Sequence, residues 1–246
     1  IYMNAILWLN GREIGKHPYG YTSFFLDVTT QIRAGEDNLL AVKVVNEGEN
    51  SRWYSGSGIY RHVWLRIAEP VHIANWGTFV TTPEITPGSA LVQVRTTIQN
   101  TTSGPVEVKV VNRIFSSGNR EVAVMEKSQY CRAAMEQEVS SFLTVSSPEL
   151  WSTERPALYR LVSEVFVQDK LTDRSETHFG IRSISYDVHN GFRLNGIPLK
   201  MKGGCVHHDN GPLGLKNAPN FSKGFFQVKN EHQDSPADNH IDRLIF

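Results

Sequence analysis

The run Val106-Glu107-Val108-Lys109-Val110 has the alternating pattern of a β-strand. Valines occupy every second position with charged residues between them, and successive side chains of a strand point to opposite faces of a sheet. One face therefore meets a core and the other meets water, which is typical of an antiparallel sheet. We expect this strand to continue to Phe115.

Similar runs lie on both sides of this strand. We expect strands at 71–81, 91–98, 121–127, 137–145 and 159–167. Turn-forming residues separate them, such as Thr86-Pro87-Gly88 and Ser103-Gly104-Pro105. Six or seven short strands in about a hundred residues predict a β-sandwich of immunoglobulin type. Because the sequence lacks the paired cysteines of antibody domains, the prediction concerns the architecture alone.

The first seventy residues also favour strands. Residues 5–9 read as a strand followed by Asn10-Gly11, a strong hairpin signal, and further strands are expected at 24–28 and 39–45. Residues 60–67 alternate as a half-buried antiparallel strand does. Its two faces are expected to carry Val63, Leu65 and Ile67 on one side and His62, Trp64 and Arg66 on the other.

A third segment begins near Gly180. Residues 192–199 contain a second Asn-Gly hairpin, and 200–203 are expected to continue as a short strand. The tail 216–246 is polar and shows neither alternation nor an apolar stripe. We expect it to be poorly packed or to owe its order to neighbouring elements.

Composition limits the function classes. The 246 residues include 25 basic and 25 acidic side chains, so nothing in the charge favours nucleic acid or an anionic membrane. Hydrophobic residues make up 40%, enough for a core. Cys131 and Cys205 are more consistent with two buried thiols than with a disulfide framework. The sequence shows no apolar run of membrane-spanning length and no signal-peptide pattern at Ile1.

Two stretches carry more than architecture. The first runs from Ala5-Ile6-Leu7-Trp8-Leu9-Asn10-Gly11 through Tyr21-Thr22-Ser23-Phe24 to Arg52-Trp53-Tyr54-Ser55-Gly56-Ser57-Gly58. It resembles the second half of the jelly-roll sugar-binding domain of glycoside hydrolase family 2, the β-galactosidase and β-glucuronidase family. The second joins Phe179-Gly180-Ile181-Arg182 to Lys202-Gly203-Gly204-Cys205-Val206-His207-His208-Asp209. It resembles the start of the same family's catalytic TIM barrel, in the β-galactosidase version.

The resemblance implies a mainly β fold: part of a jelly-roll sandwich, then an immunoglobulin-like β-sandwich, then the first strand of a truncated TIM barrel. The middle domain is also indicated by Leu150-Trp151-Ser152 and Pro156-Ala157-Leu158-Tyr159. The expected domains are 1–69, 70–180 and 181–214, followed by an anomalous tail at 215–246. The chain is thus expected to be an incomplete piece, without the first jelly-roll strands and most of the barrel.

The resemblance also implies a retaining glycosidase, which needs two carboxyl groups about 5–5.5 Å apart. The family's two catalytic glutamates lie on later barrel strands and have no counterpart here, so no catalytic residue is assigned and the chain alone is expected to be inactive. Two Asn-Glu pairs resemble the dipeptide that holds the acid/base. Asn46-Glu47 is better explained by a turn at Gly48, and Asn230-Glu231 lacks the family's strand context.

Substrate contacts are expected from two places. By resemblance His208 hydrogen-bonds sugar hydroxyls, and Asp209 orients it or contacts substrate. His207 and His208 point to opposite sides of an extended chain, which argues against a two-histidine metal site. The loop Arg52-Trp53-Tyr54 offers aromatic faces for sugar C–H surfaces and a guanidinium for hydroxyls, with Gly56 and Gly58 permitting close approach.

Ordinary structural roles compete with these assignments. His208 could instead be satisfied by a backbone carbonyl, Trp53 and Tyr54 could pack between domains, and the other tryptophans are expected in cores or interfaces: Trp8, Trp64, Trp76 and Trp151.

A non-catalytic β-sandwich module that binds carbohydrate or protein is the alternative function. The chemistry demands no cofactor, and no metal-ligand set is seen. A β-galactoside-like carbohydrate is the expected partner, a homo-oligomer stays open, and the resemblance implies a soluble protein of a bacterial cytoplasm or periplasm.

Overall fold

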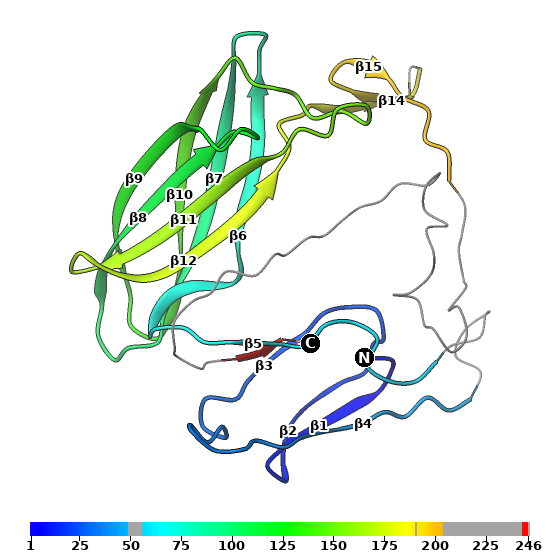
Figure 1. Ribbon diagram of the computed structural model, residues 1–246, viewed down its shortest axis with the longest axis vertical. Coiled ribbons are helices and arrows are strands. Elements are labelled where there is room, and N and C mark those ends of the chain that lie inside the picture. Colours follow the sequence, from blue (N-terminus) through cyan, green and yellow to red (C-terminus); the bar gives the residue numbers. More distant parts are fainter. Residues whose placement is uncertain (49–55, 190, 204–242, 246) are drawn as a thin grey trace. The chain divides into compact units, whose positions relative to one another are not determined.

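The computed structural model describes residues 1–48, 56–189, 191–203 and 243–245 (Figure 1). Its regular elements within these ranges are β-strands. The chain divides into two compact units, one made of Ile1–Ile67 with Lys202–Phe246 and the other of Ala68–Met201. In the part of the chain that is described, no helix is long and apolar enough to cross a membrane.

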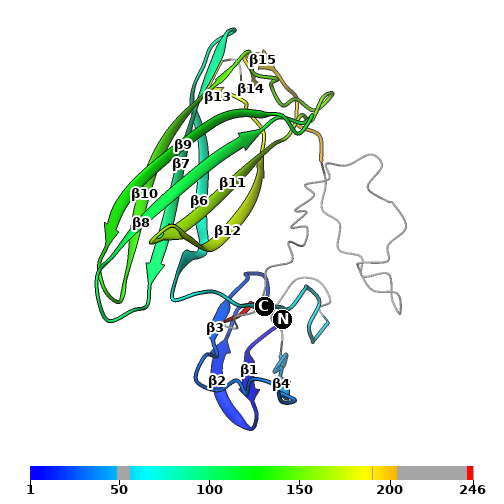
Figure 2. The same ribbon diagram turned by 60° about the vertical axis from the view of Figure 1, so that its left-hand side comes forward.

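The second unit contains a β-sandwich of seven antiparallel strands. One sheet has three strands in the order β10-β7-β6 and the other has four in the order β12-β11-β8-β9. Figure 2 shows the two layers. The strands are β6 (Val71–Ile85), β7 (Ser89–Asn100), β8 (Val106–Phe115), β9 (Glu121–Cys131), β10 (Met135–Ser146), β11 (Tyr159–Val167) and β12 (Lys170–Phe179). This confirms the prediction of an immunoglobulin-like sandwich.

The alternation of the sequence explains why these strands pair as layers. Along β7, every second residue from Ala90 to Asn100 is buried, while the residues between them are partly exposed. The apolar core between the sheets consists of two clusters, one around Val94 and Leu161 and one around Ile98 and Val165. Buried apolar area of this kind is the main favourable contribution to folding.

Polar side chains occupy the middle of the sandwich. Asn112, Ser141 and Ser163 are fully or almost fully buried. The Ser163 hydroxyl donates to Oδ1 of Asn112 at 2.6 Å, and Nδ2 of Asn112 donates to the Ser141 hydroxyl at 3.3 Å. The network links β8 and β11 to β10 in the opposite sheet, and since buried polar groups cost free energy unless they are bonded, it fixes the way the sheets face each other.

The outer face of the four-stranded sheet carries a ladder of ion pairs. Its members, in order along the contacts, are Arg113, Glu164, Arg174, Glu176 and Arg160. The separations range from 2.7 Å for Arg174–Glu176 to 3.9 Å for Arg174–Glu164. Val111 and Val162 lie on the same face yet are buried. The long arginine side chains therefore cover the apolar residues of this face.

A small sheet follows the sandwich, in the order β13 (Ile184–Asp187), β14 (Gly191–Leu194), β15 (Ile197–Pro198). Its β14–β15 turn is Asn195-Gly196, and both residues have positive φ (51° and 77°), so the predicted hairpin is confirmed. Trp151 holds this region to the sandwich, because its N–H donates to the Ile181 carbonyl and its own carbonyl accepts from Nδ2 of Asn195. Gly180 is required there, since a Cβ would lie 2.7–2.9 Å from the Trp151 side chain.

The first unit contains two three-stranded sheets, β2-β1-β4 and β3-β16-β5. The strands are β1 (Ala5–Leu9), β2 (Arg12–His17), β3 (Phe25–Asp27), β4 (Leu40–Lys43), β5 (Trp64–Arg66) and β16 (Arg243–Ile245). The Asn10-Gly11 hairpin is confirmed, with φ of 52° and 82°. The side chain of Leu26, on β3, packs against the cluster of Ala5 and Leu7, so the two sheets enclose a common core.

Two strand predictions were wrong, and the strand β12 was missed. Residues 60–67 form a strand only at Trp64–Arg66, and Leu65 is 45% exposed because none of the described residues covers that face. Residues 200–203 form no strand, so the first barrel strand is not confirmed. The strand β12 was not expected, because its polar sequence at the sheet edge hides the alternation. Of the tail after residue 214, only 243–245 are described; their backbone pairs with β3 and β5.

The tryptophans were expected in cores or interfaces, and the structure decides only against a core position at two of them. Trp76 is 65% exposed and Trp64 is 43% exposed, so neither is a core residue of the described part. Trp8 and Trp151 are partly buried, in line with structural roles. The boundaries 69/70, 180/181 and 214/215 stay predictions.

Cys131 is fully buried at the end of β9, and burial raises the pKa of its thiol. Because the thiolate is the reactive form, we expect Cys131 in the folded chain to react with a thiol reagent about 100-fold more slowly than in denaturant. The chain has two cysteines, Cys131 and Cys205, so a Cys205→Ser variant isolates the signal of Cys131. Fast stoichiometric labelling of the folded variant would contradict the burial.

Candidate functional site

The residues expected to contact a sugar lie outside the described residues: Arg52, Trp53, Tyr54, His208 and Asp209. Their roles therefore stay predictions. The Asn230-Glu231 pair also lies outside. Asn46-Glu47 is described and belongs to a loop after β4, where Glu47 is exposed and Gly48 has a φ of 77°. This agrees with the expectation of a turn.

The segment that follows the predicted sugar loop, Gly56–Arg61, is held against the N-terminal residues. Tyr2 and Gly58 exchange two backbone hydrogen bonds, of 2.9 and 3.1 Å. The Tyr60 hydroxyl donates to the Gly20 carbonyl, and Nη1 of Arg61 donates to the Tyr21 carbonyl at 3.0 Å. Gly58 has a φ of 126°, which other residues rarely adopt. Gly58, Tyr60 and Arg61, which follow the predicted loop in the sequence, are thus held by four hydrogen bonds.

A tyrosine cluster surrounds this attachment. The ring of Tyr21 lies edge-on to Tyr2 at 5.4 Å and to Tyr19 at 5.6 Å, measured between ring centroids. Tyr2 is buried, whereas Tyr19 is 54% and Tyr21 40% exposed. Gly20 has no room for a side chain, because a Cβ would come within 3 Å of three atoms of the Tyr2 ring. The rings of Tyr19 and Tyr21 are therefore exposed to solvent, while the buried ring of Tyr2 holds the cluster in place.

His17 lies beside the tyrosine cluster. Its ring stacks on Phe24 with 4.1 Å between centroids, and Nε2 lies 3.1 Å from the Thr22 hydroxyl. Burial lowers the pKa of His17. A histidine with a lowered pKa is largely neutral near pH 7, so it can hydrogen-bond but is a poor source of positive charge.

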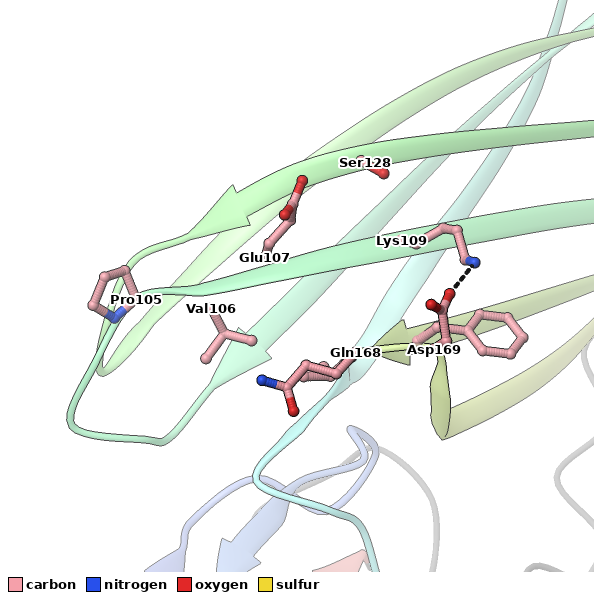
Figure 3. A pocket seen from close by; sticks show the side chains of 9 residues that line it. Pro105, Val106, Glu107, Lys109, Ser128, Gln168 and Asp169 are labelled. Atoms are coloured by element: carbon pink, nitrogen blue, oxygen red, sulfur yellow. Dashed lines mark hydrogen bonds and ion pairs between the residues drawn. The ribbon is translucent and has the colours of Figure 1, made fainter.

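A surface depression of about 540 Å³ lies over one end of the four-stranded sheet (Figure 3). Nζ of Lys109 lies 2.7 Å from Oδ1 of Asp169 and 5.3 Å from the Phe166 ring centroid. The hydrogen bond to Asp169 raises the pKa of Lys109 and lowers that of Asp169, so both remain charged. The side chains are open to solvent and already paired with each other. We therefore assign no chemistry to this depression.

The described side chains offer groups that can contact a ligand. The described ranges contain no group of three or more histidine, cysteine, aspartate or glutamate side chains able to hold a metal. The carboxylates of Glu164 and Glu176 are engaged by arginines on the sheet surface. What the first unit does offer is the exposed rings of Tyr19 and Tyr21 and the guanidinium of Arg61, a residue that follows the predicted sugar loop in the sequence.

Sequence reasoning missed the tyrosine cluster of Tyr2, Tyr19 and Tyr21, and it missed the hydrogen bond of Tyr60 to Gly20. Tyr2 and Gly58 are 56 positions apart, and only the folded chain brings them together. The alternation in Tyr19-Gly20-Tyr21 was the available signal, since it places two rings on either side of a residue without a side chain.

The described residues form an all-β protein that contains an immunoglobulin-like sandwich and a smaller two-sheet unit. Residues 71–182 match the model of glycosyl hydrolases family 2. Over 215 residues the chain is 42% identical to the β-galactosidase BoGH2A of Bacteroides ovatus, covering 87% of this chain and 25% of that protein. The chain belongs to glycosyl hydrolases family 2.

Solved structures agree with this membership. A family 2 member from Bacteroides cellulosilyticus is 47% identical with a TM-score of 0.83, covering 88% of this chain and 28% of that one. A β-glucuronidase from Bacteroides uniformis is 28% identical with a TM-score of 0.76, covering 87% and 27%. The chain thus spans about a quarter of the length of these relatives.

Proposed function

We propose that this chain serves a retaining glycosidase that removes terminal β-linked sugars, with β-galactosides as substrates. The observation that carries the proposal is the 42% identity to a β-galactosidase over 87% of the chain. The sequence Lys202-Gly203-Gly204-Cys205-Val206-His207-His208-Asp209 supports the β-galactoside assignment, since it resembles the β-galactosidase version of the barrel start.

The proposed division of labour assigns substrate contacts to this chain and no catalytic residue. Hydrolysis with retention needs one carboxyl group as acid/base and a second as nucleophile, about 5–5.5 Å apart. His208 hydrogen-bonds a sugar hydroxyl, with Asp209 orienting it or contacting substrate. Trp53 and Tyr54 stack on the sugar, and Arg52 donates to its hydroxyls. The bonds of Tyr60 and Arg61 support this role, because they hold the residues that follow the loop in the sequence.

The assignment of His208 is tested in a chimera in which residues 1–214 replace the matching part of the Bacteroides ovatus β-galactosidase. We expect His208→Ala to lower kcat/KM for a chromogenic β-galactoside about tenfold, because the transition state loses one hydrogen bond. His178→Ala, at an exposed position on β12, is the matched control and should leave kcat/KM unchanged. Equal effects of the two changes would refute the assignment of His208.

The 246-residue chain alone should not turn over the same substrate. Turnover that Glu231→Gln abolishes would place a catalytic carboxyl in the tail and overturn the division of labour. The alternative function, a non-catalytic carbohydrate-binding module, is favoured by the exposed rings of Tyr19 and Tyr21. It requires that the chimera be inactive on chromogenic β-galactosides while the chain alone binds sugar with an affinity that Trp53→Ala abolishes.

A further inference from the structure

The outer face of the three-stranded sheet differs from the ion-pair ladder on the other sheet. Two neighbouring rows of side chains cross β6, β7 and β10, as the strand registers place them. One row is Phe79, Arg95 and Ser140, and the other is Thr81, Gln93 and Phe142. We call these six residues the aromatic face. Its two phenylalanines occupy opposite corners, two hydroxyl residues occupy the other corners, and a guanidinium and an amide lie between them.

The two rings of the aromatic face are open to solvent. Phe79 is 52% exposed and Phe142 is 48% exposed. They are separated by two strand spacings and two residues along the strands, which corresponds to about 12 Å between their Cα atoms. This separation is comparable with the length of a short oligosaccharide. A ligand that spans both rings must therefore be extended.

The polar side chains of the aromatic face are held in place, and the positive charge of Arg95 is balanced by Glu138. The Arg95 guanidinium lies 4.6 Å from the Phe79 ring centroid and pairs with Glu138 at 3.4 Å. Oγ1 of Thr81 lies 3.4 Å from Oε1 of Gln93, which leaves the amide nitrogen of Gln93 as a donor. An anionic ligand gains little from a guanidinium that already has a carboxylate partner.

We propose that the aromatic face is a second carbohydrate-binding site, which takes an extended, neutral oligosaccharide. Sugar rings have apolar C–H faces and hydroxyl edges. The C–H faces match the two phenylalanine rings, and the hydroxyl edges match the guanidinium, amide and hydroxyl groups between them. The site needs none of the residues assigned to the predicted sugar loop.

The pattern favours a glycan over a protein partner. The core of a protein interface is a contiguous apolar patch with few charges. On the aromatic face, each phenylalanine instead has a polar residue directly across the strand, Arg95 for Phe79 and Gln93 for Phe142. Isolated rings with polar neighbours suit a ligand that alternates apolar faces with hydroxyl groups every few ångströms.

The proposal is tested by calorimetry on the 246-residue chain with β-1,4-galactohexaose and β-1,4-glucohexaose. We expect binding of at least one of them, weakened at least fivefold by Phe79→Ala or Phe142→Ala and retained in Phe142→Tyr. Tyr130→Ala is the matched control, because Tyr130 is a 68% exposed ring on the opposite sheet. This control should bind like the parent chain.

Three outcomes would overturn the proposal. The first is the absence of binding to both hexaoses. The second is that Trp53→Ala abolishes binding while Phe142→Ala leaves it unchanged, which would assign the glycan to the predicted sugar loop. The third is a dimer in sedimentation that Phe142→Ala dissolves, which would make the aromatic face a contact between two copies. The proposed hydrolysis is tested by a different measurement, the activity of the chimera on a chromogenic monosaccharide glycoside. The two proposals can therefore fail independently.

Discussion

Replacing Asn100 by alanine is expected to lower the free energy of unfolding of the β-sandwich by about 4 kcal/mol. Asn100 ends β7 and its side chain is completely buried. Its Nδ2 lies 3.0–3.2 Å from the carbonyl oxygens of Gly104, Cys131 and Arg132. Its Oδ1 accepts from the backbone N–H and the hydroxyl of Thr102, at 2.9 and 2.7 Å. Alanine would leave buried donors and acceptors without these partners.

The expected loss is large because one side chain connects two turns. Asn100 ties the β7–β8 turn to the β9–β10 turn, which lie in different parts of the sequence. A loss of about 4 kcal/mol corresponds to a fall in Tm of roughly 12 °C for a domain of this size. Thermal unfolding followed by circular dichroism measures it.

Ser103→Ala is the control for the Asn100 change, because Ser103 is an exposed residue of the same turn. We expect its free energy of unfolding to stay within about 0.5 kcal/mol of the parent value. A similar loss in both variants would mean that the turn tolerates no change at all. An unchanged Tm in Asn100→Ala would contradict the bonded role of the asparagine.

Much of the sandwich could be predicted from the sequence, because its strands alternate clearly. The expected bounds of β8 and β11 coincide with the observed ones. β12 was missed because it pairs with only one neighbour and carries polar residues on both faces. The turn that leads into it, Gln168-Asp169, has positive φ at both residues but no glycine to signal a hairpin.

The candidate site was less accessible to sequence reasoning. A cluster such as that of Tyr2, Tyr21 and Arg61 depends on contacts between residues some 20 to 60 positions apart. The aromatic face depends on register, since Phe79 and Phe142 share a face only because β7 aligns both with its own odd-numbered residues. A shift of one residue would turn either ring into the core. Single sequences do not specify register in this detail.

Gly77→Ala is expected to destabilise the sandwich by about 3 kcal/mol. Between Ile73 and Thr78 the strand β6 bulges, so that residues 74–77 lie opposite a single residue of β7, Thr97. A Cβ at Gly77 would come within 2.8 Å of the carbonyl oxygens of Ala74 and Thr97. Both are backbone atoms of paired strands, which cannot move aside without breaking ladder hydrogen bonds.

Gly88→Ala separates this steric effect from the general cost of replacing glycine. Gly88 lies in the turn between β6 and β7, and a Cβ there would meet no heavy atom within 4 Å. We expect Gly88→Ala to change the free energy of unfolding by less than about 1 kcal/mol, and to raise it where the turn accepts alanine, because alanine restricts the unfolded chain. Urea unfolding of both variants gives the comparison. If Gly77→Ala proved as stable as Gly88→Ala, the close packing of the bulge against Thr97 would be wrong, and with it the register that brings Phe79 opposite Arg95.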